Sequence, residues 1–399
     1  MATIDEYKSV FDRIAARGIP VRNTNEVIQW ARKRIFSLFH DFMKEYPDTF
    51  FNVTTKYITQ TQVESLFSDG ILKPEPNVRE LKRLWCEASG GYPVPSFNNW
   101  FNDSKILQFH DDDCGFCGDV YQLLKEYHRL KGISTNWLET EYKGRIYYGS
   151  LYPYACSTGR CAPKPSYGFI PGMGHEIADY LIHPQEGRKI AVLDFKSQGL
   201  CLLAALSGDP VMTKAAVYGD AYTYLAKILG VIPPDIWYRY SYQDCIRLER
   251  YRWIVKRIMI PYMYGAGDER LNKILPVQND EMTIKQKLDS LFYFYCKWKT
   301  LLKSEVKMPD GFLATGRSSS VVMVQAYDSY ILREICLRME SLFKEAEVIA
   351  TNHDSIYVEC ETEFDVNPIA DMMIQVADEV THTKGLFNVR VNEIHRNDE

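Results

Sequence analysis

The first part of the chain has a hydrophobic pattern that is mainly helical. Apolar residues recur at helical spacing over Glu26–Tyr46 and again over Val120–Leu130. The joins between these stretches are irregular, and no internal repeat or low-complexity tract is present up to residue 140. This part therefore predicts a set of helices rather than a sheet.

From Gly144 onward the pattern changes to one that mixes strands and helices. IYYGSLYPY and KIAVLDF are strand-like runs, and residues 159–174 between them are rich in Gly and Pro. Helices are expected again over residues 211–300. The tail predicts a helix over Val322–Lys344, followed by the two strands VIAT and SIYVEC.

Composition places the chain among ordinary globular proteins of two or three subdomains. It has 399 residues, of which 46% are hydrophobic and 25% charged, and its formal net charge is -5. No stretch approaches 18 uncharged apolar residues, which excludes a membrane-spanning helix on sequence grounds. The charged start MATIDEYKSVFDR and ten cysteines without a framework spacing predict a cytoplasmic location, in the host cell if the protein is viral.

Two aspartates stand where a divalent metal ion could be held. The apolar strand KIAVLDF brings Asp194 to its end, directly before the apolar helix GLCLLAALSG. In VIATNHDSIYVEC two β-rich runs form a predicted hairpin with Asp354 at its tip. The structural alternatives are a helix N-cap for the first and a turn former for the second. Carboxylates on rigid elements hold the paired Mg²⁺ ions of phosphoryl transfer, so the two together favour a metal site.

A cationic helix face lies between these two segments. Arg252, Lys256, Ile260 and Tyr264 follow each other at intervals of four and therefore share one face of a helix. Two cations followed by an apolar and an aromatic residue suit a triphosphate and a stacked base. The alternative is a solvated basic face, and Pro261 predicts a kink.

Three segments resemble motifs A, B and C of the right-hand polymerases, in that order. They are the strand with Asp194, the segment Arg-x3-Lys-x7-Tyr-Gly and the pair His-Asp. This superfamily includes the family A DNA polymerases and the single-subunit RNA polymerases of phages and mitochondria. The resemblance covers about Glu141 to Tyr357, and residues 1–140 match nothing. It implies an α+β fold with an antiparallel palm sheet, helical fingers and a reduced helical N-terminal or thumb region.

The resemblance also implies a division of the chain. Residues 1–140 are expected to form the helical N-terminal, thumb-like region, and residues 141–210 the first part of the palm with motif A. Residues 211–309 correspond to the fingers with motif B. Residues 310–399 correspond to the second part of the palm with motif C.

Three further segments extend the resemblance. EYKGRIYYGSL is similar to the D-x-x-G-R motif of the single-subunit RNA polymerases, with Glu141 where Asp is usual, and this implies that Arg145 contacts the template. RSSSVVMVQAYDSYILR is similar to the helix before motif C, which implies that Gln325 touches the minor groove of the primer-terminal pair. Thr158-Gly159-Arg160 is a weaker echo of a family A DNA polymerase signature.

One position bears on the choice between RNA and DNA synthesis. Five residues after Asp194, related DNA polymerases carry Glu, which excludes a ribose 2′-OH, whereas here Gly199 has no side chain. By the same resemblance, Tyr264 senses the 2′-OH, and His353-Asp354-Ser355 reads as in the RNA polymerases. The alternative is that Gly199 only caps its helix.

The resemblance implies a role for each candidate residue. Asp194 and Asp354 are expected to bind two Mg²⁺ ions, and Arg252 and Lys256 to neutralise the triphosphate, with Lys256 as the general acid. Tyr264 and Gly265 are expected to bound the nucleotide pocket, and His353 to orient the primer terminus. The expected partners are a DNA template, an RNA product and ribonucleoside triphosphates.

Size suggests a further partner. Gly265 and Asp354 are 89 positions apart, which leaves little room for the specificity loop of larger relatives. We therefore expect a second polypeptide to recognise or melt the promoter, as in phage RNA polymerases that are divided between two chains. The promoter, the template form and the primer dependence stay open.

Three other interpretations stay open at this point. The nearest is a family A DNA polymerase or primase without an exonuclease domain. The second is an inactive nucleic-acid-binding scaffold, against which the four charged residues of the candidate site speak. Third, Cys114-Gly-Phe-Cys117 with His110 is a weak indication of zinc, because a single CxxC lacks a second pair.

Overall fold

The computed structural model describes residues 2–45, 83–87, 119, 130, 141–147, 150–164, 170–172, 175–232, 242–274 and 282–396. Contacts divide the chain into two units, one made of residues 1–21 and 145–399 and the other of residues 22–144. The first helix therefore joins the unit that holds the mixed second part, and does not group with the rest of the first 140 residues. Of the described helices, none has the length and apolar content needed to cross a bilayer.

The described elements of the second unit include the long helix α2 (Thr24–Glu45), which confirms the helix expected over Glu26–Tyr46. The strand β2 (Glu141–Tyr142) and a short helical stretch at residues 83–87 also belong to it. The helix expected over Val120–Leu130 lies outside the described residues apart from Leu130, which is buried. Cys114, Cys117 and His110 lie outside them as well.

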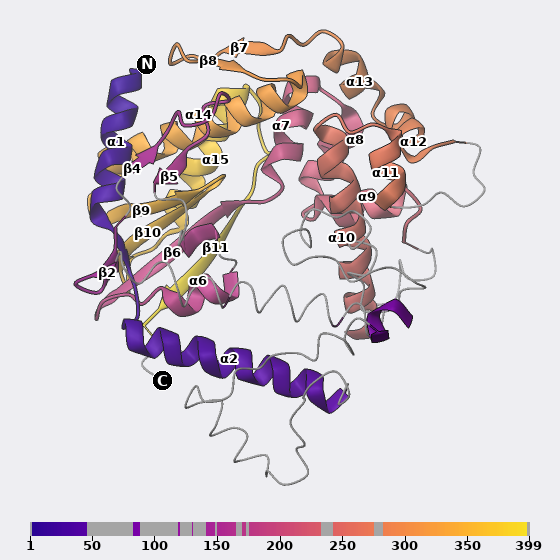
Figure 1. Cartoon of the computed structure of the whole chain (residues 1–399). Coiled ribbons are helices and arrows are strands. Elements are labelled where there is room, and N and C mark those ends of the chain that lie inside the picture. The colour runs from indigo at the N-terminus through magenta and orange to yellow at the C-terminus, as the bar shows by residue number, and fades with distance from the viewer. Residues whose placement is uncertain are drawn as a thin grey trace. The chain divides into compact units, whose positions relative to one another are not determined.

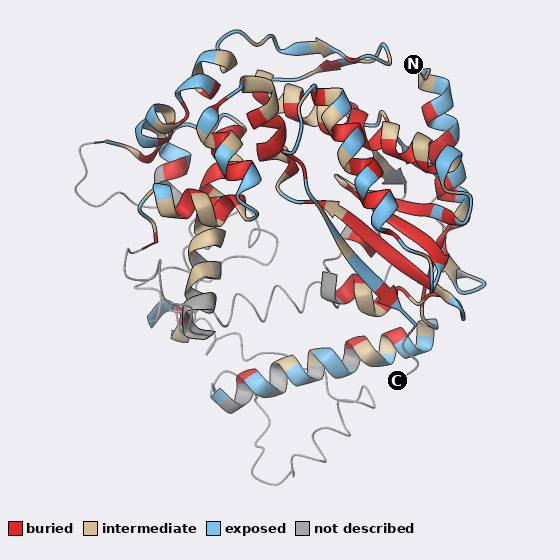
Figure 2. Cartoon of the chain, turned by 180° about the vertical axis from the view of Figure 1, so that it is seen from behind, coloured by how far each residue is buried: buried red, intermediate tan, exposed pale blue. Residues whose placement is uncertain are grey.

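A four-stranded antiparallel sheet with the order β11-β6-β10-β9 is the centre of the first unit (Figure 1). Its strands are β6 (Arg188–Phe195), β9 (Ala346–Asn352), β10 (Ser355–Glu361) and β11 (Val389–His395). Six consecutive residues of β10 are buried, as are most residues of β6 (Figure 2). The two central strands are therefore covered on both faces, which explains their continuous apolar sequence.

Helices α14 (Ser319–Leu342) and α15 (Asn367–Thr381) pack against each other and against opposite edges of this sheet. They cover the same face of it, and α1 (Ile4–Arg17) packs beside them on α14 and β9. The helix predicted over Val322–Lys344 is thus confirmed within a few residues, whereas α15 and β11 were not predicted. A capping box between Thr3 and Glu6 begins α1.

A helical part follows β6 directly, as the pattern over residues 211–300 predicts, with residues 233–241 and 275–281 outside the description. Its helices pack in succession, and α13 returns to α7. They are α7 (Gln198–Ser207), α8 (Pro210–Val217), α9 (Ala221–Ile228), α10 (Tyr242–Met263), α11 (Asp268–Ile274), α12 (Ile284–Leu291) and α13 (Tyr293–Lys299).

Smaller elements complete the first unit. Three short antiparallel pairs join β1 to β3, β4 to β5 and β7 to β8, and two short helices precede β6. The elements are β1 (Ile19–Pro20), β3 (Arg145–Ile146), β4 (Ser150–Tyr152), β5 (Ala162–Lys164), η6 (Ile170–Gly172), α6 (His175–Leu181), β7 (Glu305–Lys307) and β8 (Leu313–Thr315).

One buried arginine of α14 holds several of these pieces together. Arg333 forms an ion pair with Asp310 at 2.8 Å, and both side chains are at most 1% exposed. Its guanidinium also donates to the carbonyl of Gly159 at 3.0 Å and lies over the ring of Tyr154. Arg333 therefore links α14, the loop after β4 and the β7–β8 turn.

We expect Arg333→Met to lower the free energy of unfolding by about 3–5 kcal/mol, because Asp310 then stays buried without its counter-charge. Arg338→Met on the same helix is the control, since its partner Glu379 is 45% exposed, and it should cost less than about 1 kcal/mol. Urea unfolding followed by circular dichroism measures both. Equal losses in the two variants would contradict this account of Arg333.

Candidate active site

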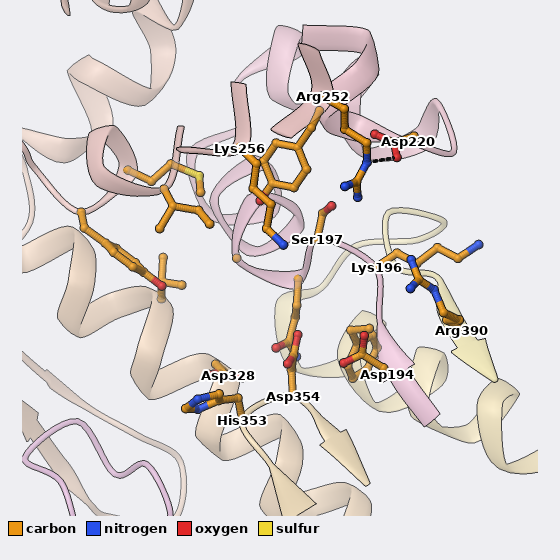
Figure 3. A pocket seen from close by; sticks show the side chains of 18 of the residues that line it. Asp194, Lys196, Ser197, Asp220, Arg252, Lys256, Asp328, His353, Asp354 and Arg390 are labelled. Carbon is orange, nitrogen blue, oxygen red and sulfur yellow. Dashed lines mark hydrogen bonds and ion pairs between the residues drawn. The ribbon is translucent and has the colours of Figure 1, made fainter. Parts of the chain in front are cut away.

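The site is built where two strands of the central sheet end side by side. Ser355 at the start of β10 pairs with Asp194 near the end of β6, so Asp354 lies one residue beyond the partner of Asp194. Both aspartates line a cavity of about 760 Å³ (Figure 3). The two acids predicted from the sequence therefore share one cavity.

A residue close to each aspartate in the chain has a left-handed backbone conformation, which side chains disfavour. Ser197, between β6 and α7, has φ 56°, and His353, in the two-residue turn between β9 and β10, has φ 55°. Left-handed backbone at residues other than glycine costs energy and concentrates at functional sites. These turns aim both strand ends into the cavity.

Helix α10 contributes the cationic face that the sequence predicts. Arg252, Lys256, Ile260 and Tyr264 all line the cavity. Figure 3 shows Lys256 pointing from α10 into the cavity toward the acids. Pro261 lies inside the helix near its end, which Tyr264 extends by donating to the Ile260 carbonyl at 3.1 Å.

Arg252 does not act alone on that face. Its Nε donates to a carboxylate oxygen of Asp220, the N-cap residue of α9. Both Arg252 and Lys256 lie within 6 Å of the Tyr222 ring centre. The position of the two cations is therefore set by α9 as well as by α10.

A third carboxylate, Asp328, was not predicted from the sequence. It lies on α14, lines the same cavity and is 2% exposed. Arg160 Nε donates to Asp328 Oδ2 at 2.9 Å. Burial raises the pKa of Asp328, and Arg160 opposes this rise. Thr158-Gly159-Arg160, which on sequence alone was only a weaker echo of a polymerase signature, is the signal that could have pointed to this pair.

The loop that carries Arg160 is held along one face of α14. Thr158 Oγ1 donates to Gln325 Oε1 at 3.0 Å, and Ser329 Oγ donates to the Thr158 carbonyl at 3.2 Å. Gly159 has φ 82°, and a Cβ there would lie 3.2 Å from Ser329 Oγ. A glycine is therefore required for the loop to lie this close to the helix.

Burial and the neighbouring carboxylates disfavour the ionised form of Asp354. Burial, followed by the charges of Asp328 and Asp194, raises the pKa of Asp354 to about 8. Partial burial of its ring and the nearby Arg160 guanidinium lower the pKa of His353. A bound cation would relieve the repulsion among the acids.

The other predicted site residues fall into two groups. Gly199 and His353 line the cavity. Gly265 has φ 84°, and a Cβ there would lie 3.3 Å from Ser318 Oγ, so it shapes the end of α10 without itself lining the cavity. Gln325 likewise does not line the cavity, and bonds instead to the Thr158 side chain next to Arg160.

Arg145 lies away from the two acids, and its expected contact with the template stays a prediction. Its guanidinium pairs with the buried carboxylate of Glu359 and donates to the carbonyls of Arg17 and Gly18. Glu359 lies five residues along β10 from Asp354, about 17 Å at the rise of an extended strand. Arg145 is not among the cavity-lining residues, and its contacts join α1, β3 and β10.

Lys196, Asp220 and Arg390 also line the cavity, and none was singled out in the sequence. Lys196 is two residues after Asp194, and Arg390 is opposite Asp194 in the backbone register of β11 and β6. Only the fold of β11 onto β6 brings Arg390 to the acids.

The fold that carries these two acids is similar to that of a polymerase domain among the solved structures. One of 130 matching chains is the POL domain of Pol1 from M. smegmatis in complex with DNA primer-template and dNTP. The TM-score is 0.63 at 13% identity, covering 97% of this chain and 69% of that chain. No family model and no curated protein matches the sequence.

The raised pKa of Asp354 predicts a pH-dependent stability of the metal-free protein. An unfolded aspartate titrates near pH 3.9, so the folded state retains this proton up to about pH 8. Stability from this group is therefore complete below pH 4 and is lost as the pH rises toward 8. In EDTA, the stability of Asp354→Asn relative to the wild type should increase as the pH rises from 5 to 8.5, by up to about 1.4 kcal/mol per pH unit below pH 8, because only the wild type carries this titrating carboxyl group.

Urea unfolding at the two pH values measures this difference. Asp371→Asn, an exposed acid on α15, serves as the control and should show no such change between them. A constant difference between Asp354→Asn and wild type across this range would contradict the elevated pKa.

Proposed function

We propose that this protein is a template-directed nucleotidyltransferase that extends an RNA 3′ end on a DNA template. The observation that carries the proposal is the shared cavity in which Asp194 and Asp354 lie beneath the Arg252 and Lys256 face of α10. The similarity of the fold to a DNA polymerase domain supports the wider class of reaction.

The acids suit Mg²⁺ as the implied metal. Among the described residues no group of three or more His, Cys, Asp or Glu is arranged to hold an ion. Mg²⁺ does not need one, because it is commonly bound by one or two carboxylates together with substrate phosphates and water. Asp194 and Asp354 would hold two such ions, which when bound activate the 3′-hydroxyl and stabilise the charge of the phosphates.

The remaining residues divide the work on the nucleotide. Arg252 and Lys256 bind the triphosphate, and Tyr264 provides a surface for the base at the end of the same helix face. The 3′-oxygen bonds to the α-phosphorus and loses its proton to solvent, while the bond to the β-phosphate oxygen breaks. Lys256 protonates the departing pyrophosphate.

On the polynucleotide side, His353 next to Asp354 orients the primer terminus, with Arg160 beside it. Its lowered pKa makes His353 a neutral hydrogen-bonding group at pH 7 rather than a second cation. Gln325 supports Arg160 through Thr158. A second polypeptide for promoter recognition or melting remains part of the proposal.

Ribonucleotide use is supported by the space at Gly199. A Cβ there would meet only Val324 Cγ1, at 3.8 Å, so the position is open to the cavity. Without a side chain at this point, steric exclusion of a 2′-OH is absent. The alternative is a DNA polymerase or primase, which the DNA-bound Pol1 neighbour favours.

Extension of an RNA primer on a DNA template, with each nucleotide set and Mg²⁺, tests the proposal. We expect ribonucleotide incorporation by the wild type, and a loss of at least about a hundredfold to a thousandfold in both Asp194→Ala and Asp354→Ala. Asp371→Ala is the matched control and should keep full activity. Undiminished synthesis by Asp354→Ala would overturn the proposal, and a wild type that prefers deoxyribonucleotides would establish the alternative.

Gly199→Glu should shift sugar selectivity toward deoxyribonucleotides by about tenfold or more, because the new side chain fills the space beside the sugar. Gly199→Ala adds only a methyl group at ordinary contact distance from Val324 and should change the ratio little. The measurement is the ratio of kcat/KM for the two nucleotide types. An unchanged ratio in the Glu variant would show that another element selects the sugar.

A further inference from the structure

Two cations stand on the β11 side of the cavity. Arg390 is opposite Asp194 in the backbone register of β11 and β6. The Lys196 backbone amide donates to the Asn388 carbonyl at 2.8 Å. Directly opposed residues and residues two apart share one face of an antiparallel pair. Lys196 and Arg390 are thus diagonal neighbours on the face that presents Asp194, and both line the cavity.

These two cations differ from the other arginines of the cavity in their partners. Arg160 pairs with Asp328, and Arg252 pairs with Asp220. Within the described part of the chain, neither Lys196 nor Arg390 forms an ion pair, and both are exposed. Two neighbouring cations at the edge of a cavity suit an anion that carries phosphate groups.

Their side of the cavity indicates which anion this is. In the sheet, β10 flanks β6 on one side and β11 on the other. Figure 3 shows His353 and Asp328 on one side of the two acids, and Lys196 and Arg390 on the other. The proposed function places the primer terminus on the His353 side. In phosphoryl transfer the leaving group departs opposite the attacking oxygen, which here is away from His353, on the side where Figure 3 shows Arg252 and Arg390.

We propose that Lys196 and Arg390 form a subsite for the pyrophosphate that leaves the α-phosphate. The subsite rests on the proposed function for its role, but its ligand is defined by charge and position. Its two cations, one from motif A and one from β11, match the two phosphoryl groups of pyrophosphate. Arg252 and Lys256 hold the triphosphate before transfer, and this pair receives its β- and γ-phosphates afterwards.

Isothermal titration of the full chain with inorganic pyrophosphate and Mg²⁺ tests the subsite directly. We expect Lys196→Ala/Arg390→Ala to weaken binding by about tenfold or more, since two charge-assisted contacts are lost. Lys214→Ala/Lys307→Ala removes the same charge from exposed positions outside the cavity and should bind like the wild type. Lys196→Arg/Arg390→Lys keeps both charges and should restore binding to within about threefold of wild type.

Several results would overturn the subsite. One is a wild type that does not bind pyrophosphate at all, and another is equal affinity for it in the two double-alanine variants. A third such result is that Lys196→Ala/Arg390→Ala loses affinity for a primed template while its pyrophosphate binding is unchanged. The last result would assign the two cations to a strand phosphate. Titration needs no turnover, so it separates the two proposals. Pyrophosphate binding that depends on Lys196 and Arg390, in a protein that incorporates no nucleotide, would uphold the subsite while the polymerase proposal fails.

Discussion

The pairing of β6 with β10 is the interaction on which the site depends. Ser355 opposes Asp194, and this register alone brings Asp354 to the end of β6. A slip of one residue would turn every side chain of a strand to the other face of the sheet. Ile190, Leu193, Ile356 and Val358 are fully buried, so both strands lie within the core almost up to the ends that carry the acids. Hydrophobic burial in the strands thus pays for a concentration of charge at their ends.

Arginines on separate elements partly neutralise the negative charge of these acids. Arg160 comes from the loop after β4 and is bonded to Asp328 of α14, whereas Arg252 of α10 is bonded to Asp220 at the start of α9. Neither bond reaches Asp354, whose pKa stays high because burial and the charges of Asp328 and Asp194 act on it together. The protein therefore neutralises Asp328 and Asp220 with its own arginines, while Asp354 remains a buried acid whose ionised form is disfavoured.

Sequence patterns predicted the parts of this arrangement that are local. The apolar run ending at Asp194, the hairpin at Asp354 and the four-residue spacing on α10 each follow from the periodicity of a single element. Asp328 could not be found this way, since an acid in the middle of a helix has no local mark of its burial against Arg160. Arg390 likewise acquires its position only when β11 pairs with β6. Arg145 shows the opposite case, in which a motif matched well but Glu359 and two backbone carbonyls engage the side chain elsewhere.

Helix α14 contacts residues on both sides of the cavity. Gln325, Ser329 and Arg333 hold the Thr158–Arg160 loop, and Val324 on the same helix is the nearest contact for a side chain at position 199. The loop lies on the side of the proposed primer terminus, whereas Gly199 is the second residue of α7, the helix that follows β6. Small shifts of α14 would therefore move Arg160 and the wall opposite Gly199 together. Because Arg333 and Asp310 anchor this helix through a buried ion pair, the space at Gly199 and the position of the Arg160 loop depend on the same rigid element.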